Sequence, residues 1–271
     1  MSWPELNQCI KAVDWSWYQN DGSTQHKPFD VDAFCAAHPY VELAVIRACW
    51  PDGSPDPHYP HYYDGFHRNN KKVAAYLWPN PKKAIGDTLE DWKRALGARI
   101  PKLLAYDYEE ATTFAGVSNA RVTQAMRESW EVAHLHFPNQ KHINYSRGNW
   151  LATRIVLGAW FHEIPWWIAH YIYPTPNVPK MAAQFSQIDS ILPIGNSFTP
   201  ARGPVLLENV KGWQFTSGLQ IVPNGTSDGD YFLKSFINPI YGEEPPPVPS
   251  PKVPVTIQVP KDKVDIRIVE L

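Results

Sequence analysis

The sequence has few cysteines, no long apolar run and no excess of charge of either sign. Three cysteines in 271 residues cannot all pair within one chain. Cys9, Cys35 and Cys49 each lie in an apolar stretch, where a reduced thiol acts as a small hydrophobic side chain. The formal net charge is −2 and no run is rich in lysine and arginine, which argues against nucleic acid as a partner. No segment approaches the ~20 apolar residues needed to cross a bilayer, so no membrane partner is expected.

Several catalytic signatures are also missing. The chain has no nucleophile elbow of the form G-x-S-x-G, no G-x-G-x-x-G string and no P-loop. Histidines gather at His58, His61 and His67, and again at His134 and His136. Zinc needs ligands that converge, and residues two apart on a helix do not face one another. We therefore expect neither a metal nor an organic cofactor.

The N-terminal residues lack the basic segment and apolar core of a secretory signal peptide. This predicts synthesis in a cytoplasm, with any export depending on another route. What the chain does contain in quantity is 12 tryptophans, 13 tyrosines and 27 prolines. Aromatic side chains can fill a core, and their flat faces can also stack on sugar rings, so both interpretations stand at this point.

Short β-type runs alternate with helix-like segments along most of the chain. The runs cover residues 10–16, 41–50, 71–79, 101–109, 141–146, 164–171 and 210–217. The helix-like segments cover 31–38, 61–72, 87–99, 118–137 and 148–156. Ser118 is a good N-cap for the longest of them, and Thr88 followed by Asp91 resembles a capping box. This alternation predicts an α/β fold in which a parallel sheet closes into an irregular, TIM-like β/α barrel.

The barrel is expected to be irregular because residues 174–204 are rich in proline, serine, asparagine and glycine, with no clear helix. At Glu243 the composition changes again, to EEPPPVPSPKVP. We predict one principal domain over residues 1–242, a semi-rigid proline-rich linker over 243–254 and a short hairpin-like tail over 255–271. So small a hairpin is not stable alone, so the tail is expected to dock on another protein or mediate oligomerisation.

Acidic residues end two of the predicted strands. Asp14 ends the first, and Asp107 and Glu109 end the fourth. Side chains two apart on a strand point to the same side, so Asp107 and Glu109 should share one cavity while Tyr108 and Glu110 point away. Two carboxylates in one pocket repel each other, which tends to raise the pKa of one and leave the other ionised, as acid-base chemistry on a glycosidic bond requires. From spacing alone, however, ordinary strand-end acids paired with arginine or lysine are the favoured interpretation.

Eight short motifs occur together and in order over about residues 13–232. They are VDWSWYQ, VIRA, AYLWP, YDYE, INYS, PWWIAHY, WQFTSG and DGDYF. In this combination the sequence resembles glycoside hydrolase family 25, the lysozyme-type muramidases common in phages and bacteria. The resemblance implies a β/α barrel of eight strands with fewer than eight helices. It also implies cleavage of the β-1,4 bond between N-acetylmuramic acid and N-acetylglucosamine in bacterial peptidoglycan.

Carried over by motif, the resemblance assigns catalytic roles to four acids. Glu109 would be the general acid, and Asp107 would stabilise positive charge or position the acetamido group of the substrate. Asp14 would hold this arrangement from the barrel floor. The family's last acid aligns with Asp228, with Asp230 in the place of an asparagine, but the alternative register stays open.

Other residues are candidates for contact with the glycan. The aromatic and amide side chains at strand ends are Tyr76, Trp78, Tyr145, Trp166, Trp167, Tyr171, Trp213 and Gln214. Each could equally pack in the core. Arg47 could contact substrate or pair with Asp14 or Asp107. The third strand ends in Tyr-Leu-Trp-Pro, which departs from the Tyr-His-Phe-like sequence of the family and predicts altered substrate contacts there.

The sequence thus predicts a muramidase that reaches the cell wall after release by a holin, by lysis or as part of a virion. The alternative is a barrel that binds glycan or serves a structural role, in a phage particle or a cell-wall assembly, without turnover. Four converging acids argue for the enzyme.

Overall fold

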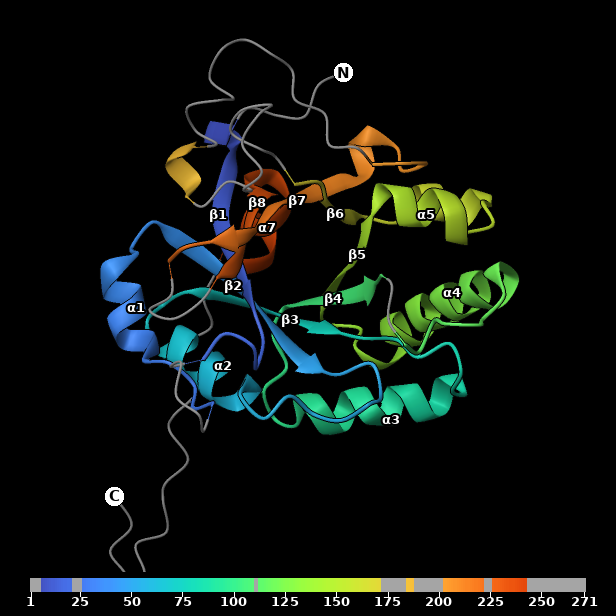
Figure 1. Cartoon of the computed structure of the whole chain (residues 1–271), viewed down its shortest axis with the longest axis horizontal. Coiled ribbons are helices and arrows are strands. Elements are labelled where there is room, and N and C mark those ends of the chain that lie inside the picture. Colours follow the sequence, from blue (N-terminus) through green and yellow to red (C-terminus); the bar gives the residue numbers. More distant parts are fainter. Residues whose placement is uncertain are drawn as a thin grey trace, which may run out of the picture. The chain divides into compact units, whose positions relative to one another are not determined.

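A barrel of eight strands forms the centre of the computed structural model, which describes residues 6–20, 26–109, 112–171, 184–187, 202–221 and 226–242. The strands close in sequence order (Figure 1). They are β1 (Cys9–Trp15), β2 (Val41–Cys49), β3 (Lys72–Leu77), β4 (Leu103–Tyr108), β5 (Lys141–Arg147), β6 (Trp166–Ala169), β7 (Val210–Leu219) and β8 (Ser227–Leu233). The first seven lie where the β-type runs predicted them, and β8 is the strand that hydrophobic patterning did not indicate.

Helices follow the first five strands and lie on the outer side of the barrel in Figure 1. The described α-helices are α1 (Val31–Ala37), α2 (Tyr59–Arg68), α3 (Ile85–Leu96), α4 (Asn119–His136), α5 (Gly148–Arg154) and α7 (Lys234–Tyr241). Short 3-10 turns are η1 (Leu6–Gln8), η2 (Ala159–Glu163) and η3 (Leu207–Asn209). The prediction of fewer helices than a regular eightfold barrel is confirmed over the described residues.

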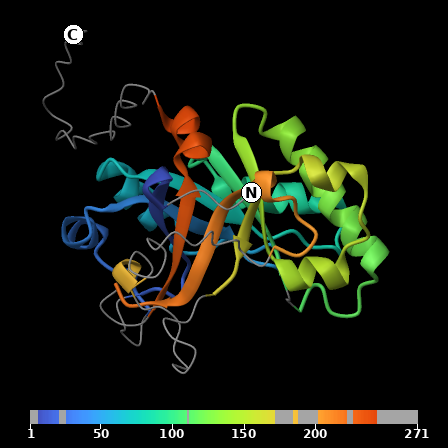
Figure 2. The same ribbon diagram turned by 90° about the horizontal axis from the view of Figure 1, so that it is seen from above.

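The direction of β8 differs from the expected parallel sheet. Neighbouring strands from β1 to β7 are parallel, whereas β8 runs antiparallel to both β7 and β1. Figure 2 shows β7 and β8, in orange and red, side by side. Only seven residues separate Leu219 from Ser227, and a parallel connection needs a crossover of about a dozen residues or more. The short connection therefore forces the last strand to reverse.

Each strand is buried on both faces, which explains its nearly continuous apolar sequence. On β4, Leu103 and Ala105 pack inside the barrel. Leu104, Tyr106 and Tyr108 belong to the larger core between the strands and the helices. The period of two along a strand thus decides whether a side chain faces the interior or the helical layer.

One predicted helix start is confirmed and another is wrong. The Ser118 side chain accepts a hydrogen bond from the Arg121 amide, as an N-cap does. Thr88 and Asp91 form no capping box, because α3 begins at Ile85 and both residues lie inside it. The Asp91 carboxylate instead pairs with Lys83 at 2.6 Å and with Arg94.

All three cysteines are buried, and none forms a disulfide with another residue that the structure describes. Burial raises the pKa of Cys9 and of Cys49 to about 12, so both stay protonated and unreactive at neutral pH. No helix among the described residues is long and apolar enough to span a membrane. Glu110, the proline-rich linker and the hairpin-like tail lie outside the described residues, and the boundary at residue 242 stays a prediction.

Candidate active site

The interior of the barrel changes from apolar to polar at the carboxyl ends of the parallel strands. On β1, Ile10 and Ala12 pack in the interior core, and Asp14 follows in the same phase. On β4 the same phase leads through Ala105 to Asp107 and then to Glu109, just beyond the strand. The period-two argument from the sequence therefore delivers both acids to the same end of the barrel.

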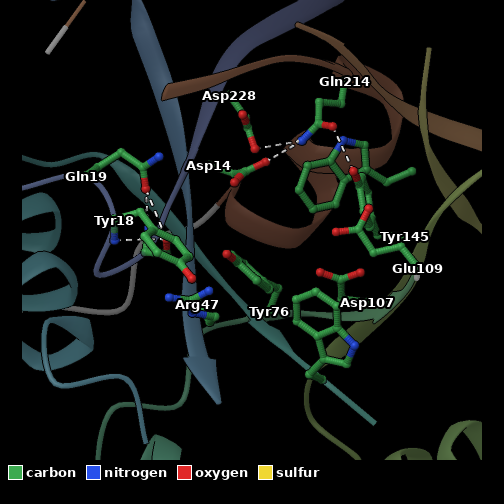
Figure 3. A pocket seen from close by; sticks show the side chains of 13 residues that line it. Asp14, Tyr18, Gln19, Arg47, Tyr76, Asp107, Glu109, Tyr145, Gln214 and Asp228 are labelled. Atoms are coloured by element: carbon green, nitrogen blue, oxygen red, sulfur yellow. Dashed lines mark hydrogen bonds between the residues drawn. The ribbon is translucent and has the colours of Figure 1, made fainter. Parts of the chain in front are cut away.

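The antiparallel strand adds a fourth acid from the opposite chain direction. Asp228 lies near the start of β8 and is paired in register with Asp14. Because β8 runs backwards, its first residues reach the edge where the parallel strands end. Asp14, Asp107, Glu109 and Asp228 all line one cavity of about 220 Å³ (Figure 3).

Thirteen residues line this cavity. They are Asp14, Ser16, Tyr18, Gln19, Arg47, Tyr76, Trp78, Asp107, Glu109, Tyr145, Trp167, Gln214 and Asp228. Tyr18 is well exposed, whereas most of the others are buried, so the cavity deepens from an aromatic rim to an acidic floor. Such a mixture of flat rings and convergent polar groups suits a sugar ring, which offers both apolar faces and hydroxyl groups.

Gln214 joins the acids to two tyrosines. Its amide nitrogen donates to Asp14 Oδ2 at 2.6 Å and to Asp228 Oδ2 at 3.3 Å. Its amide oxygen accepts from the hydroxyl groups of Tyr145 at 2.7 Å and Tyr171 at 3.0 Å. Figure 3 shows Asp14 and Asp228 both pointing toward this amide. All four hydrogen-bonding positions of the side chain are used, which fixes its orientation and holds the carboxylates in place.

Asp14 and Asp228 form a pair of buried acids that interact with each other. Burial raises the pKa of Asp14 to about 7, against the opposing effect of hydrogen bonds from Gln214 and Asp228. Burial and the neighbouring Asp14 charge raise the pKa of Asp228 well above its usual range. Two buried carboxyl groups this close cannot both ionise cheaply, so one donates a hydrogen bond to the other.

Asp107 and Glu109 form the second acidic pair. Burial, followed by the charges of Glu109 and Asp14, raises the pKa of Asp107 well above its usual range. Asp107 Oδ1 is buried and has no hydrogen-bond partner among the described residues. Burial also raises the pKa of Glu109, and the Arg147 guanidinium opposes that rise. The raised pKa favours the protonated form of Glu109. Because its side chain is 21% exposed, a ligand can also reach it.

Arg47 pairs with neither of the acids proposed from the sequence. Its Nε donates to Asp56 Oδ2 at 2.9 Å, and both side chains are buried. The guanidinium carbon lies 3.4 Å from the centroid of the Trp50 ring, which fixes its plane. Arg47 still lines the cavity, and its Nη2 is buried without a hydrogen-bond partner among the described residues. The expected partners were wrong because Asp56, on the loop after β2, lies closer.

Three of the aromatic candidates are not among the residues that line the cavity, namely Trp166, Trp213 and Tyr171, whose hydroxyl group instead donates to Gln214. Trp166 and Trp213 are fully buried in the core between the strands and the helices. The prediction that these two tryptophans line the cleft is wrong, because the next residue on each strand faces the barrel interior and the tryptophan therefore faces the helices. Trp167, next to Trp166, lines the cavity, as do the candidates Tyr76, Trp78 and Tyr145.

The structure separates the two acids of β8. Asp228 lines the cavity, whereas Asp230 lies one step deeper in the same interior phase and is fully buried. Asp230 Oδ1 accepts a hydrogen bond from Trp167 Nε1 at 3.0 Å. Of the two alignments left open by the sequence, the geometry thus favours Asp228 as the cavity acid and gives Asp230 a supporting position beneath it.

Sequence reasoning missed Arg147, which forms an ion pair with Glu109 at 3.2 Å. It ends β5 two residues after Tyr145, so the period of two could have placed it on the same side. The rim residues Ser16, Tyr18 and Gln19 were also missed, because they follow β1 in a turn that has no strand periodicity. Among the described residues, no three histidine, cysteine, aspartate or glutamate side chains are arranged to hold a metal ion.

Comparison with known proteins agrees with this geometry. The family model of Glycosyl hydrolases family 25 matches residues 13–223, which include the end of β1, all of β2 to β7 and three of the four cavity acids. The chain belongs to this family. As a member of family 25 it is a glycoside hydrolase, of the lysozyme-type family that the sequence motifs indicated. No curated protein sequence matches the chain.

Solved structures share the family 25 fold at low sequence identity. The CTP1L endolysin is 19% identical, with a TM-score of 0.58, over 87% of this chain and 70% of that one. A family 25 glycosyl hydrolase from Bacillus anthracis is 15% identical, with a TM-score of 0.58, over 89% and 96% of the two chains. A family 25 lysozyme from Aspergillus fumigatus is 14% identical, with a TM-score of 0.57, over 86% and 98%. These likenesses establish the barrel fold.

Proposed function

We propose that this glycoside hydrolase is a muramidase that cleaves the β-1,4 bond between N-acetylmuramic acid and N-acetylglucosamine in bacterial peptidoglycan. The observation that carries the proposal is the set of four acids in one aromatic-rimmed cavity, with Glu109 the acid at its open side. The endolysin and lysozyme names of the structural neighbours support the same substrate class.

Glu109 is the general acid in this mechanism. A general acid must hold a proton near neutral pH and still lose it to the leaving oxygen, which a moderately raised pKa allows. Burial supplies that rise, and the exposed edge of the carboxyl gives access to a glycosidic oxygen. As the bond breaks, the Glu109 proton moves to the leaving oxygen, and positive charge develops on the sugar ring.

The other three acids form the surroundings of that charge. Asp107 Oδ1 has no hydrogen-bond partner in the described part of the chain, which suits contact with the acetamido group of the sugar or with its positive charge. Asp14 and Asp228, held by Gln214, make up the floor. A negative charge on this pair would stabilise an oxocarbenium-like transition state.

Aromatic side chains set the shape of the cleft in this proposal. Tyr76, Trp78, Tyr145 and Trp167 line the cavity, and Tyr18 projects at its rim. Flat rings stack on the apolar faces of sugars. We assign them to binding the glycan strand on either side of the scissile bond. The enzyme would meet its substrate after release by a holin, by lysis or on a virion.

The test is hydrolysis of purified bacterial cell walls, followed by the release of reducing ends. Glu109→Gln removes the proton but keeps the shape, and we expect at least a hundredfold loss of kcat, on the scale of general acid catalysis. Glu131→Gln, on an exposed ion pair of α4 with Arg127, is the matched control and should retain activity. Unchanged turnover in Glu109→Gln would remove Glu109 from its role. No turnover by the wild type on any wall would favour a glycan-binding barrel instead.

A further inference from the structure

Asp230 is a buried acid that the proposed mechanism does not use. It lies on β8 between Asp228 and Phe232, in the phase that faces the barrel interior, and its side chain is fully buried. Its Oδ1 accepts the hydrogen bond from Trp167 Nε1 at 3.0 Å. Its Oδ2 is also buried and has no hydrogen-bond partner among the residues that the structure describes. The bond to the indole is therefore the contact through which this acid can act on the cavity.

The indole reaches Asp230 across a strand that carries no side chain at the crossing point. Trp167 is on β6 and Asp230 is on β8, with β7 between them. Gly212 of β7 is paired in register with both Trp167 and Phe232. A Cβ added to this glycine would lie 3.0 Å from Trp167 Cδ1 and 2.5 Å from Phe232 Cε1. A larger residue would crowd both rings, so the glycine leaves the space that the indole needs to point its N–H at the carboxyl.

Trp167 belongs to a pair of rings in the cavity wall that is held at both ends. It lines the cavity with Tyr145, and the two ring centroids are 4.5 Å apart. The Tyr145 hydroxyl donates to Gln214, whose amide nitrogen donates in turn to Asp14. Asp230 thus fixes one end of the pair, and the amide that binds the floor acids fixes the other. Rings held in this way lose little freedom when a ligand binds, which favours affinity.

The surroundings of Asp230 favour an uncharged carboxyl. Burial, followed by the charges of Asp14 and Asp228, raises its pKa well above the usual range. Gln214, which is in register with Asp230 on β7, and Trp167 bring no positive charge. A protonated acid keeps an oxygen that accepts from the indole, as an amide oxygen would, and it adds no further negative charge beneath the floor.

We propose that Asp230 is a positioning residue, which binds the Trp167 indole and thereby fixes the inner wall of the cavity for an uncharged sugar ring. It acts as a hydrogen-bond acceptor and takes no part in the transfer of a proton to the glycosidic oxygen. Without this acceptor the indole N–H is buried and unpaired, so the ring turns towards another partner and the wall changes shape. The effect on the glycan rests on the proposed function, and it concerns binding rather than cleavage.

The variants Asp230→Asn and Asp230→Leu test this role, because both keep the shape of the side chain and only the amide keeps an acceptor. Binding of the neutral tetramer of N-acetylglucosamine is measured by calorimetry in the Glu109→Gln background, which prevents turnover. For Asp230→Leu we expect Kd to rise about threefold to tenfold, the range of one neutral hydrogen bond. Asp230→Asn should keep Kd within about twofold. Trp166→Phe, which alters the neighbouring ring on the other face of β6, is the matched control and should leave Kd unchanged.

Kinetics on solubilised cell walls separate positioning from catalysis. With Glu109 intact, Asp230→Leu should raise KM about threefold to tenfold and keep kcat within about twofold, because the general acid and its surroundings are retained. Trp167→Phe removes the donor instead of the acceptor and should raise KM by a similar factor. This second variant keeps the test decisive if Asp230→Leu does not fold.

A measurement without ligand separates the role of Asp230 from the proposed function. In the NMR spectrum of isotope-labelled protein, the indole N–H signal of Trp167 is identified by its absence in Trp167→Phe. We expect Asp230→Leu to shift this signal upfield, as loss of a hydrogen bond does, and Asp230→Asn to leave it nearly unchanged. If neither the tetramer nor the wall is bound or cleaved but the shift is seen, the muramidase proposal fails and the positioning of Trp167 stands.

Two results would overturn the proposed role. An indole signal that does not move in Asp230→Leu, or a Kd equal to that of the wild type, would show that the hydrogen bond does not position the ring. A rise in Kd that is as large in the Trp167→Phe background as with the tryptophan present would show that Asp230 acts by a route other than the indole.

Discussion

The buried carboxyl of Asp14 should make the protein less stable as the pH rises. Its pKa is raised from 3.8 to about 7 by burial. Below about pH 4 the group is protonated in both the folded and the unfolded chain, so it does not lower the free energy of unfolding. Between these values the unfolded chain releases its proton while the folded chain retains it, so the free energy of unfolding falls, and above pH 7 the cost is complete.

The size of the effect follows from the shift. About 3 pKa units at 1.36 kcal/mol each amount to about 4 kcal/mol. Asp14→Asn removes this cost and keeps an amide oxygen that can accept from Gln214, as Asp14 Oδ2 does at 2.6 Å. We expect the variant to exceed the wild type in free energy of unfolding by about 1 kcal/mol at pH 4.5 and about 4 kcal/mol at pH 7.5. Its turnover should fall, since the floor of the cavity loses its charge.

Urea unfolding followed by tryptophan fluorescence at the two pH values measures this difference. Asp32→Asn is a control of opposite sign. Hydrogen bonds from Asn69 and Arg68 hold the pKa of the Asp32 carboxyl below its usual value, so its stabilising effect is present at neutral pH and is lost as the pH falls. A difference between wild type and Asp14→Asn that is the same at pH 4.5 and 7.5 would show that burial does not raise the pKa of Asp14.

Three further substitutions test the geometry of the cavity. Gln214→Leu removes the donor to Asp14 and the acceptor of the Tyr145 hydroxyl, and should lower the free energy of unfolding by about 2–4 kcal/mol in urea titrations, with a loss of kcat. A Gln214→Leu variant as stable as the wild type would contradict this role. Trp167→Phe breaks the hydrogen bond to Asp230 and should lower kcat/KM on cell walls, whereas Trp166→Phe should cost about 1–2 kcal/mol of stability and leave kcat/KM intact. Equal kinetic effects of the two would show that strand phase does not decide which ring meets the substrate.

Much of the barrel could be predicted because each strand is short and can be recognised from its own residue pattern. Residues buried on both faces give runs such as LLAYDY, and the turns between them are polar. The acids Asp107 and Glu109 could be placed together by period alone. The eighth strand was harder, since SDGDYFL carries two aspartates and a glycine and lacks a continuous apolar run. Its aspartates are tolerated because they face the polar end of the barrel interior.

The sequence could not predict which side chains of β6 and β7 face the barrel interior. Trp166 and Trp167 are chemically identical neighbours, and nothing local says which one faces inward. The answer depends on the register of β6 against β5, where Trp167 is paired with Tyr145. Register is set by contacts between segments far apart in sequence, so a shift of one residue would exchange the two rings.

The residue types that end the strands, and with them the class of chemistry, follow from the order of amino acids, because side-chain alternation is a property of each strand alone. Which charges meet depends instead on how the strands are arranged in three dimensions. The reversal of β8 brings Asp228 beside Asp14, the loop after β2 gives Arg47 to Asp56, and the end of β5 sets Arg147 against Glu109. These pairings depend on the closure of the barrel, which brings together side chains that are between 9 and 214 positions apart in the chain.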